Sequence, residues 1–132
     1  MLKDKKLAVI ILTPAGKKIA LKLKKSVSSL DIYLSHKLKG KEKNNEFYYF
    51  NSLKKTVNDI FYKYDGLIFI MALGIVVRII APLLKSKKTD PAVITIDDTG
   101  QNVVSTLSGH LGGANQLSSE LAELLAARPV IT

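Results

Sequence analysis

The chain has 132 residues, enough for one domain and too few for two of ordinary size. It contains no cysteine, which excludes disulfides, thiolate metal sites and a cysteine nucleophile. The net charge is +9, carried almost entirely by lysines in residues 1–64. Lysine is a solvated point charge, and no aromatic residues are interleaved to stack on bases. We therefore expect no nucleic-acid partner and a solvated surface with a mild attraction for polyanionic ligands.

The first half of the chain alternates between apolar runs and amphipathic segments. Leu7–Leu12 is continuously apolar, as expected for a strand covered on both faces. Ile19, Leu23 and Val27 recur at four-residue spacing, which is typical of one helix face. The pattern predicts strands over 7–12 and 30–34, helices over 15–25 and about 51–63, a polar, mobile loop over 36–46 and a short aromatic cluster over 47–50.

The most hydrophobic stretch runs from Leu67 to Leu84 and is long enough to suggest a membrane helix. Gly74, Arg78 and Pro82 interrupt it, and a charge in the middle of a span is costly. We therefore expect no membrane span. The second half is divided into strands over 67–72 (central), 92–96 and 103–107, a turn over 97–100, helices over 75–84 and around Leu117, Leu121, Leu124 and Leu125, a glycine-rich loop over 108–115 and the start of a strand at 129–132.

Strands and helices in this order predict one α/β domain over residues 1–132. Its fold is expected to be three-layered and Rossmann-like, with a mainly parallel sheet and one hairpin. Ligands in such folds bind beyond the carboxyl ends of the strands. We expect three loops to gather there: Thr13–Gly16, Met71–Gly74 and Ser108–Asn115.

The loop over 108–115, SGHLGGAN, is the strongest local signal. Its three glycines let the backbone approach a ligand, and the helix that follows begins with free N–H groups and a partial positive charge. These features predict a site for phosphate or carboxylate. The alternative is a tight turn with Asn115 as the helix N-cap. The candidate binding residues here are Ser108, Gly109, Gly112, Gly113 and Asn115.

Two side chains are candidates for chemistry. His110 could act as acid and base near neutral pH, or it could be merely structural or exposed. His36 is the only other histidine, so spacing assembles no protein metal site. Arg78 lies between branched apolar residues and must reach water or a carboxylate, which would belong either to a ligand or to Asp90.

Five further positions are weaker candidates for binding. Asp90 precedes Pro91 at the start of a strand and is either a turn former or an acid at the site. Asp97 and Asp98 fall in the hairpin turn and are interpreted as solvated. The remaining candidates follow predicted strands, where a plain turn is the alternative reading. The five are Thr13, Gly16, Met71, Gly74 and Asp90.

Three segments together resemble the cobalamin-biosynthesis protein G family in their order and spacing. They are FIMALGIVVR at 69–78, KTDPAV at 88–93 and LSGHLGGAN at 107–115. The resemblance is specific over about 64–132 and general before that. Leu73 departs from it slightly, because a small or polar residue is commoner there.

The resemblance implies an amino-terminal domain of a cobalt-precorrin-5A hydrolase, acting in the cytoplasm in anaerobic cobalamin synthesis. Such enzymes open the δ-lactone of cobalt-precorrin-5A, release acetaldehyde and leave cobalt-precorrin-5B. The cobalt belongs to the corrinoid substrate, so no cofactor or protein-held metal is expected. Family members are usually longer, so we expect a carboxy-terminal domain to be absent from this chain and supplied as a partner domain or split subunit.

The resemblance also suggests roles for individual residues. His110 would be the general acid or base, Arg78 would hold a carboxylate, and backbone N–H groups around Gly109–Gly113 would stabilise an oxyanion. A non-catalytic corrinoid- or anion-binding α/β module is the alternative. A generic nucleotide- or phosphate-binding domain is the third reading.

Overall fold

Within residues 2–40 and 46–132, which the computed structural model describes, seven strands form one sheet. Their order across the sheet is β3-β2-β1-β4-β5-β6-β7, so β4 is central, as predicted for the most hydrophobic strand. The strands are β1 (Leu7–Ile11), β2 (Asp31–Ser35), β3 (Phe47–Phe50), β4 (Gly66–Ile70), β5 (Ala92–Ile96), β6 (Asn102–Leu107) and β7 (Arg128–Val130).

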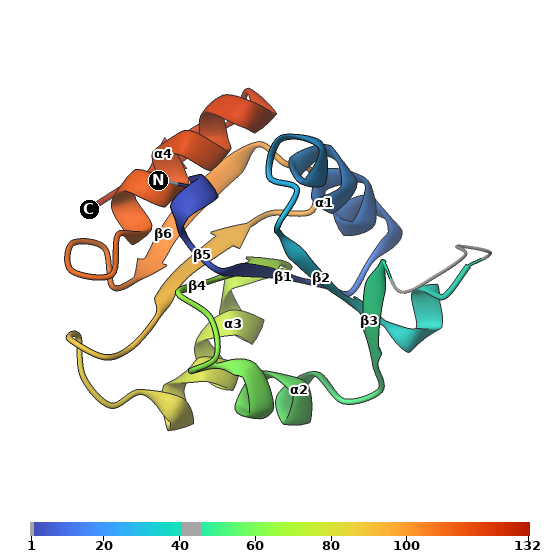
Figure 1. Ribbon diagram of the computed structural model, residues 1–132, viewed down its shortest axis with the longest axis horizontal. Helices are drawn as coiled ribbons and strands as arrows, with labels where there is room; N and C mark the ends of the chain where they lie inside the picture. The colour runs from blue at the N-terminus through green and yellow to red at the C-terminus, as the bar shows by residue number, and fades with distance from the viewer. Residues whose placement is uncertain (1, 41–45) are drawn as a thin grey trace.

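Helices cover both faces of the sheet, which confirms the predicted three-layer α/β architecture. α1 and α4 lie on one face and α2 and α3 on the other (Figure 1). Alternate side chains of β1 feed the two resulting cores: Val9 and Ile11 face α1 and α4, whereas Ala8 and Ile10 face α2 and α3. The helices are α1 (Pro14–Ser26), α2 (Leu53–Ile60), α3 (Leu73–Ile80) and α4 (Ala114–Leu125), with short 3-10 turns η1 (Leu2–Asp4), η2 (His36–Leu38) and η3 (Ala81–Leu83).

Strand direction decides which loops can meet. β1 to β5 are parallel, but β5 pairs with β6 in the predicted antiparallel hairpin, and β7 is parallel to β6. We call the side where β1, β4 and β5 end the carboxyl edge and the side where they begin the amino edge. The loop after β6 therefore emerges at the amino edge. The prediction that Ser108–Asn115 joins the loops Thr13–Gly16 and Met71–Gly74 is wrong.

Figure 1 shows this separation. The orange loop after β6 and the loop leading into β5 lie together on the left, whereas the blue connection from β1 to α1 lies on the right. The long apolar stretch 67–84 is divided between β4, α3 and η3. No helix in the described part of the chain is long and apolar enough to cross a membrane.

Two differences concern the first half of the chain. The aromatic cluster Phe47–Phe50, to which no regular structure was assigned, forms β3, an outer strand paired in parallel with β2. Of the loop predicted over 36–46, residues 36–38 form η2 and residues 41–45 lie outside the described part of the chain.

Candidate functional site

At the carboxyl edge, the connection from β1 to α1 is held by its own side chains. Thr13 is the N-cap of α1: its Oγ1 accepts a hydrogen bond from the Gly16 N–H at 3.1 Å and donates to Asp98 Oδ1 at 3.2 Å. Gly16 is buried, and a Cβ there would lie 2.9 Å from Ile11 Cγ2. Both residues thus have a local structural function at the start of α1.

The start of α3, by contrast, is uncapped. Its N-cap, Ala72, has no side chain that could accept a hydrogen bond, and no acceptor in the described part of the chain meets the N–H groups of Leu73 and Gly74. Met71 precedes it, with a buried side chain and its N–H donated to Ile96 O at 3.1 Å. The first turn of α3 therefore presents free donors and a partial positive charge.

Arg78 adds a full charge to this helix start. It lies one turn further along α3, and its Nη1 is 3.5 Å from where a Cβ of Gly74 would be. The guanidinium therefore reaches back over the first turn, as long side chains on helices do. Arg78 is exposed, and within residues 2–40 and 46–132 no hydrogen bond or ion pair engages it. Arg78 and the N–H groups of Leu73 and Gly74 can together bind a carboxylate.

A hollow of about 240 Å³ opens beside this helix start. Asp97 and Asp98 line it from the β5–β6 turn. Asp97 accepts hydrogen bonds from the Asn102 N–H at 2.6 Å and from the Thr99 hydroxyl. Burial alone would raise the pKa of Asp97, but these hydrogen bonds lower it below its ordinary value. The full lining is Met71, Ala72, Leu73, Thr95, Asp97, Asp98, Asn102 and Val104.

Sequence reasoning missed this contribution of the hairpin turn. Asp98 is exposed, which confirms its interpretation as a solvated turn residue, whereas Asp97 is half-buried. Both follow the carboxyl end of β5, where ligands of parallel sheets bind. Their position after this strand could have indicated their place beside a ligand site. Because both are carboxylates, an anionic ligand would be favoured on the α3 side of the hollow and repelled on the hairpin side.

At the amino edge, Asp90 organises the loop that leads into β5. It is only 8% exposed. Its carboxylate accepts hydrogen bonds from the N–H groups of Lys85 and Ser86 at 3.0 and 3.3 Å. The Tyr62 hydroxyl lies 2.7 Å from both Asp90 Oδ1 and Leu83 O, and its single proton serves one of them at a time. The alternative that Arg78 pairs with Asp90 is therefore wrong.

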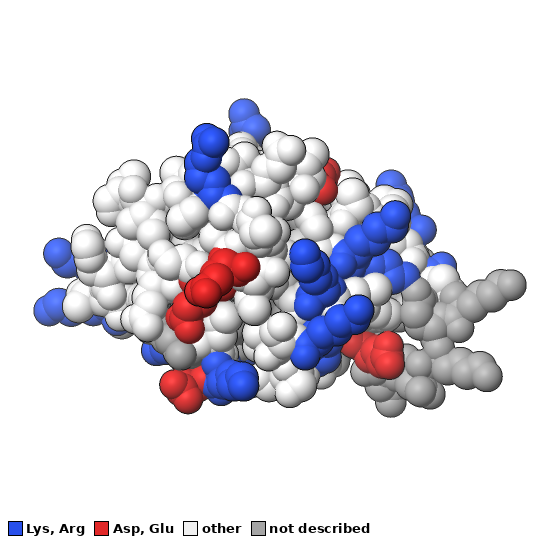
Figure 2. All heavy atoms as spheres, turned by 90° about the horizontal axis from the view of Figure 1, so that it is seen from above, with Lys and Arg blue, Asp and Glu red and all other residues white. Residues whose placement is uncertain are grey.

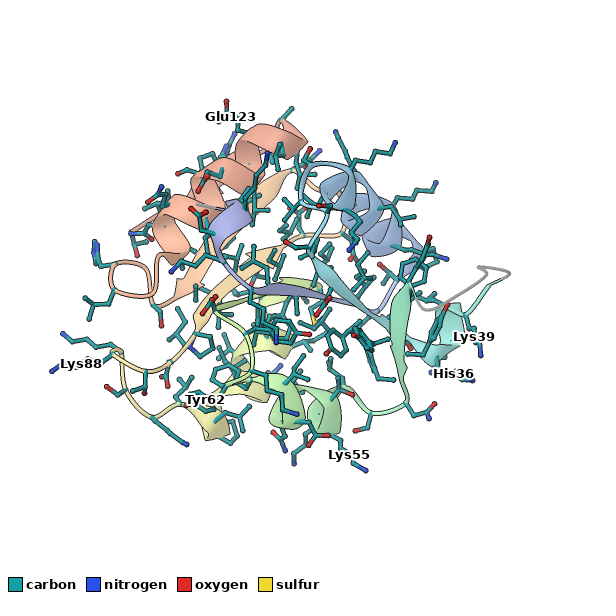
Figure 3. All side chains as sticks on the ribbon, viewed as in Figure 1. His36, Lys39, Lys55, Tyr62, Lys88 and Glu123 are labelled. Carbon is teal, nitrogen blue, oxygen red and sulfur yellow. The ribbon has the colours of Figure 1, made fainter. Side chains whose placement is uncertain are left out.

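The pKa values of this pair follow from the contact. Burial, followed by the hydrogen bond to Asp90, raises the pKa of Tyr62 to about 12. For Asp90, burial opposes ionisation, but the hydrogen bonds from Tyr62, Lys85 and Ser86 lower its pKa below the ordinary value. Figure 3 shows Tyr62 beneath the sheet and, at the left, Lys88 on the loop that contains Asp90. We assign Asp90 to loop closure.

The glycine loop packs directly on this Asp90 segment. Ser108, which adopts a left-handed φ of 59°, donates from Oγ to Asp90 O at 3.2 Å. A Cβ on Gly112 would lie 2.5 Å from Ser108 Cβ, and one on Gly109 would lie 2.7 Å from Asn115 Oδ1. Gly112 is therefore required by the packing of the loop on itself, whereas a side chain at Gly109 would have to displace the Asn115 amide.

Much of the loop's backbone is hydrogen-bonded internally. The N–H groups of Gly113, Ala114 and Asn115 donate to the carbonyls of His110, Ser108 and Gly109 at 3.1–3.3 Å. α4 begins at Ala114 with Gly113, at φ 83°, as its N-cap. Asn115 lies inside the helix and its Oδ1 accepts from Ser105 Oγ at 2.6 Å, so the alternative of Asn115 as N-cap is wrong.

The tip of the loop remains open. His110 is exposed, and Leu111 is 69% exposed. No hydrogen bond or ring contact engages the His110 imidazole in the described part of the chain, nor does an acceptor there meet the N–H groups of His110, Leu111 and Gly112. A self-braced loop thus presents one imidazole and up to three backbone donors to the outside.

The candidate residues therefore form two groups. A five-residue strand such as β5 spans about 15 Å, so the edges are separated by roughly that distance. Thr13, Gly16, Met71, Gly74 and Arg78 belong to the carboxyl edge, and Asp90 and the glycine loop to the amino edge. His36 lies beyond β3 at the right of Figure 3, far from the loop of His110. No cluster of three His, Cys, Asp or Glu side chains suited to a metal ion occurs in the described residues.

The fold and these two edges define a Rossmann-like α/β domain with open polar groups at each end of its sheet. Residues 55–132 match the family described as "Cobalamin synthesis G N-terminal", and the chain belongs to this family.

Curated relatives extend the match over nearly the whole chain. The cobalt-precorrin-5A hydrolase of Priestia megaterium is 49% identical over 127 residues, and that of Salmonella typhimurium is 44% identical over 131 residues. These alignments cover 95% and 98% of this chain but only 34% and 36% of the relatives. The chain thus spans about a third of the length of the curated relatives it matches.

The crystal structure of a cobalamin biosynthesis protein G homologue from Sulfolobus solfataricus has the same fold. It superposes with a TM-score of 0.73 at 31% identity, covering 96% of this chain and 36% of that one.

Proposed function

We propose that the chain supplies the amino-terminal part of a cobalt-precorrin-5A hydrolase and acts in cobalamin biosynthesis in the cytoplasm. The observation that carries this proposal is the 49% identity to the Priestia megaterium hydrolase over 95% of the chain. In the reaction, water opens the δ-lactone of cobalt-precorrin-5A, and the two-carbon fragment leaves as acetaldehyde to give cobalt-precorrin-5B. Cobalt enters with the corrinoid, and the protein contributes no cofactor of its own.

The carboxyl edge is suited to hold the periphery of this substrate. Corrinoid intermediates carry many acetate and propionate groups. The Arg78 guanidinium and the uncapped start of α3 offer charge and donors to one of these carboxylates. The carboxylates of Asp97 and Asp98 would keep it on the α3 side of the hollow.

The amino edge is suited to proton transfer. His110 stands on a loop whose position is fixed by glycine packing and internal hydrogen bonds, and its imidazole is exposed. The backbone that carries His110 is fixed, and its exposed imidazole can reach the lactone for acid–base work. The open N–H groups of His110, Leu111 and Gly112 would stabilise the oxyanion that forms when water attacks.

The remaining two-thirds of the relatives would complete the enzyme, as part of the same polypeptide or as a separate subunit. Active sites frequently lie between domains, and neither edge of this domain is enclosed on its own. The working form for experiments is a hybrid hydrolase, in which this chain replaces the matching 127 residues of the Priestia megaterium relative.

The test is an anaerobic assay with cobalt-precorrin-5A in which acetaldehyde is trapped. The proposal predicts acetaldehyde from the hybrid hydrolase at a rate well above the protein-free control. Acetaldehyde from the chain alone would place the whole catalytic apparatus within it. A shift of the corrinoid spectrum by the chain without turnover would support the alternative of a recognition module that needs its partner. Absence of both turnover by the hybrid and spectral shift would refute a corrinoid function.

A further inference from the structure

α3 exposes an unusual surface. Of its eight residues only Val76 and Ile80 are fully buried, and Ile79 is half-buried. Leu73, Ile75 and Val77 are 45%, 37% and 48% exposed. At 100° per residue, these three residues with Gly74 and Arg78 span a continuous exposed arc of about 200° around the helix. We call this surface the α3 face: Leu73, Gly74, Ile75, Val77 and Arg78.

The exposed sides of the other helices are mainly polar. The exposed side of α1 carries Lys18, Lys22 and Lys25, and that of α2 carries Lys54, Lys55, Asn58 and Asp59. Seen from the side of α1 and α4, lysines gather over α1 (Figure 2). α2 and α4 expose no large apolar residue, and α1 exposes one, Leu21. An outward side of a helix is normally polar, so a concentration of apolar residues on one helix marks an interface.

The α3 face is also continuous with the open groups of the carboxyl edge. Leu73 lines the hollow that Asp97 and Asp98 share. On the opposite flank Arg78 borders a second hollow, of about 260 Å³, whose lining includes Lys54 and Pro82. A protein surface docked on the α3 face would therefore cover the apolar residues and enclose the Arg78 guanidinium at the same time.

We propose that the α3 face is the docking surface for the polypeptide that makes up the remaining two-thirds of the hydrolase, an inference that rests on the function proposed above. The relatives show that a domain nearly half identical to this one is joined to about twice its own length of further chain. If the domain and that further chain form the active site together, they pack against each other. Among the helices of the described residues, α3 leaves the most large apolar side chains exposed, and it lies in the part of the sequence that matches the family.

Docking on this face would serve the proposed chemistry. Arg78 shares the exposed side of α3 with Leu73, Ile75 and Val77, so an apolar partner surface that covers this side also excludes water from the guanidinium. In a drier environment the attraction between Arg78 and a substrate carboxylate becomes stronger. The partner surface should therefore be apolar, with a gap that lets the substrate carboxylate reach Arg78.

The test measures how fast a cysteine on the α3 face reacts with a thiol reagent. The chain has no cysteine, so Val77→Cys introduces a single one, and Ile75→Cys gives a second position on the same face. Lys22→Cys on the exposed side of α1 is the matched control. Each variant is alkylated as the isolated chain and as the hybrid hydrolase without substrate, and the modified peptide is quantified by mass spectrometry.

The proposal predicts that Val77→Cys and Ile75→Cys react about tenfold or more slowly in the hybrid than in the isolated chain, because reaction requires opening of the interface. Lys22→Cys should react equally fast in both. Equal rates at positions 75 and 77 in a folded hybrid would overturn the proposal. Protection already present in the isolated chain and relieved by dilution would overturn it too, because a second copy would then cover the face. Since no turnover is measured, inactivity of the hybrid bears on the proposed function alone.

Discussion

The two edges of the sheet differ in how far their polar groups are hydrogen-bonded within the domain. At the amino edge, the carboxylate of Asp90 and three N–H groups of the glycine loop are hydrogen-bonded within the domain. At the carboxyl edge, α3 begins without a capping side chain and the Arg78 guanidinium has no partner in the described residues. The amino edge is thus a braced scaffold that presents one side chain, His110, whereas the carboxyl edge is an open cluster of donors.

This difference favours proton transfer at the amino edge and carboxylate binding at the carboxyl edge. A braced loop fixes the backbone from which the exposed His110 imidazole would reach the substrate for proton transfer. An open helix start with a long, flexible arginine suits the capture of a carboxylate whose position can vary. Because the edges are about 15 Å apart, one substrate atom cannot touch both. Variants at the two edges should therefore change different kinetic constants.

Replacement of His110 should have the largest effect. If His110 transfers a proton to or from the opening lactone, His110→Ala in the hybrid hydrolase should lower kcat by roughly 10²–10⁴-fold. The thermal midpoint should hardly change, because the ring makes no described contact. The measurement is acetaldehyde release at saturating substrate. Leu111→Ala, which removes the exposed neighbour, is the control and should retain most activity; an active His110→Ala enzyme would move the chemistry away from the amino edge.

Replacement of Asp90 tests whether the amino edge is held by its buried carboxylate. Asp90→Asn should lower the free energy of unfolding by about 2 kcal/mol near neutral pH. The reason is that a neutral amide replaces the charged carboxylate that accepts hydrogen bonds from the Lys85 and Ser86 N–H groups and the Tyr62 hydroxyl. The measurement is denaturant unfolding of the isolated chain.

The effect should depend on pH in one direction. The pKa of Asp90 is lowered in the folded protein, so its contribution is complete above the ordinary value of 3.8 and is lost as pH falls through the lowered value. The difference between wild type and Asp90→Asn should thus be constant from about pH 7 to about pH 5 and shrink in stronger acid. A difference that grew in acid would contradict the assignment.

The glycine loop provides a stability test with an internal control. Gly112→Ala should destabilise the chain by about 1–3 kcal/mol, because the added Cβ would overlap Ser108 and the loop must shift. Gly74→Ala, on the exposed first turn of α3, meets only Arg78 Nη1 at 3.5 Å and should be neutral or slightly stabilising. Thermal melts of both variants compare a packed edge with an open one. Equal melting temperatures would mean that the loop is less tightly packed than its contacts indicate.

Much of this architecture was accessible from the sequence because apolar runs and four-residue spacings are local. The central strand, the hairpin between β5 and β6 and the helix after the glycine loop all follow from such patterns. The edge of the glycine-rich loop could have been predicted as well: a hairpin reverses the direction of its second strand, and this alone places Ser108–Asn115 at the amino edge. The prediction failed because the rule for the carboxyl ends of parallel strands was applied to β6, which is antiparallel to β5.

The hydrogen-bond partners of the charged side chains could not be predicted from the sequence. Arg78 and Asp90 are twelve residues apart and of opposite charge, yet Asp90 is satisfied by backbone N–H groups of its own loop and by Tyr62. The participation of Asp97 and Asp98 in the hollow was missed because turn residues with carboxylates usually face water. Only the rule that ligands gather at carboxyl ends of parallel strands could have indicated them.

Replacement of Arg78 should have the smallest effect and the most specific one. Arg78→Ala in the hybrid hydrolase should raise KM about tenfold with kcat nearly unchanged, because one peripheral carboxylate loses its partner equally in ground and transition states. Arg78→Lys keeps the charge but not the fork of donors, so it should recover only part of the loss. Steady-state kinetics measure the split. A fall in kcat with unchanged KM would instead place Arg78 at the reacting bond, and the carboxyl edge rather than His110 would then be the centre of the chemistry.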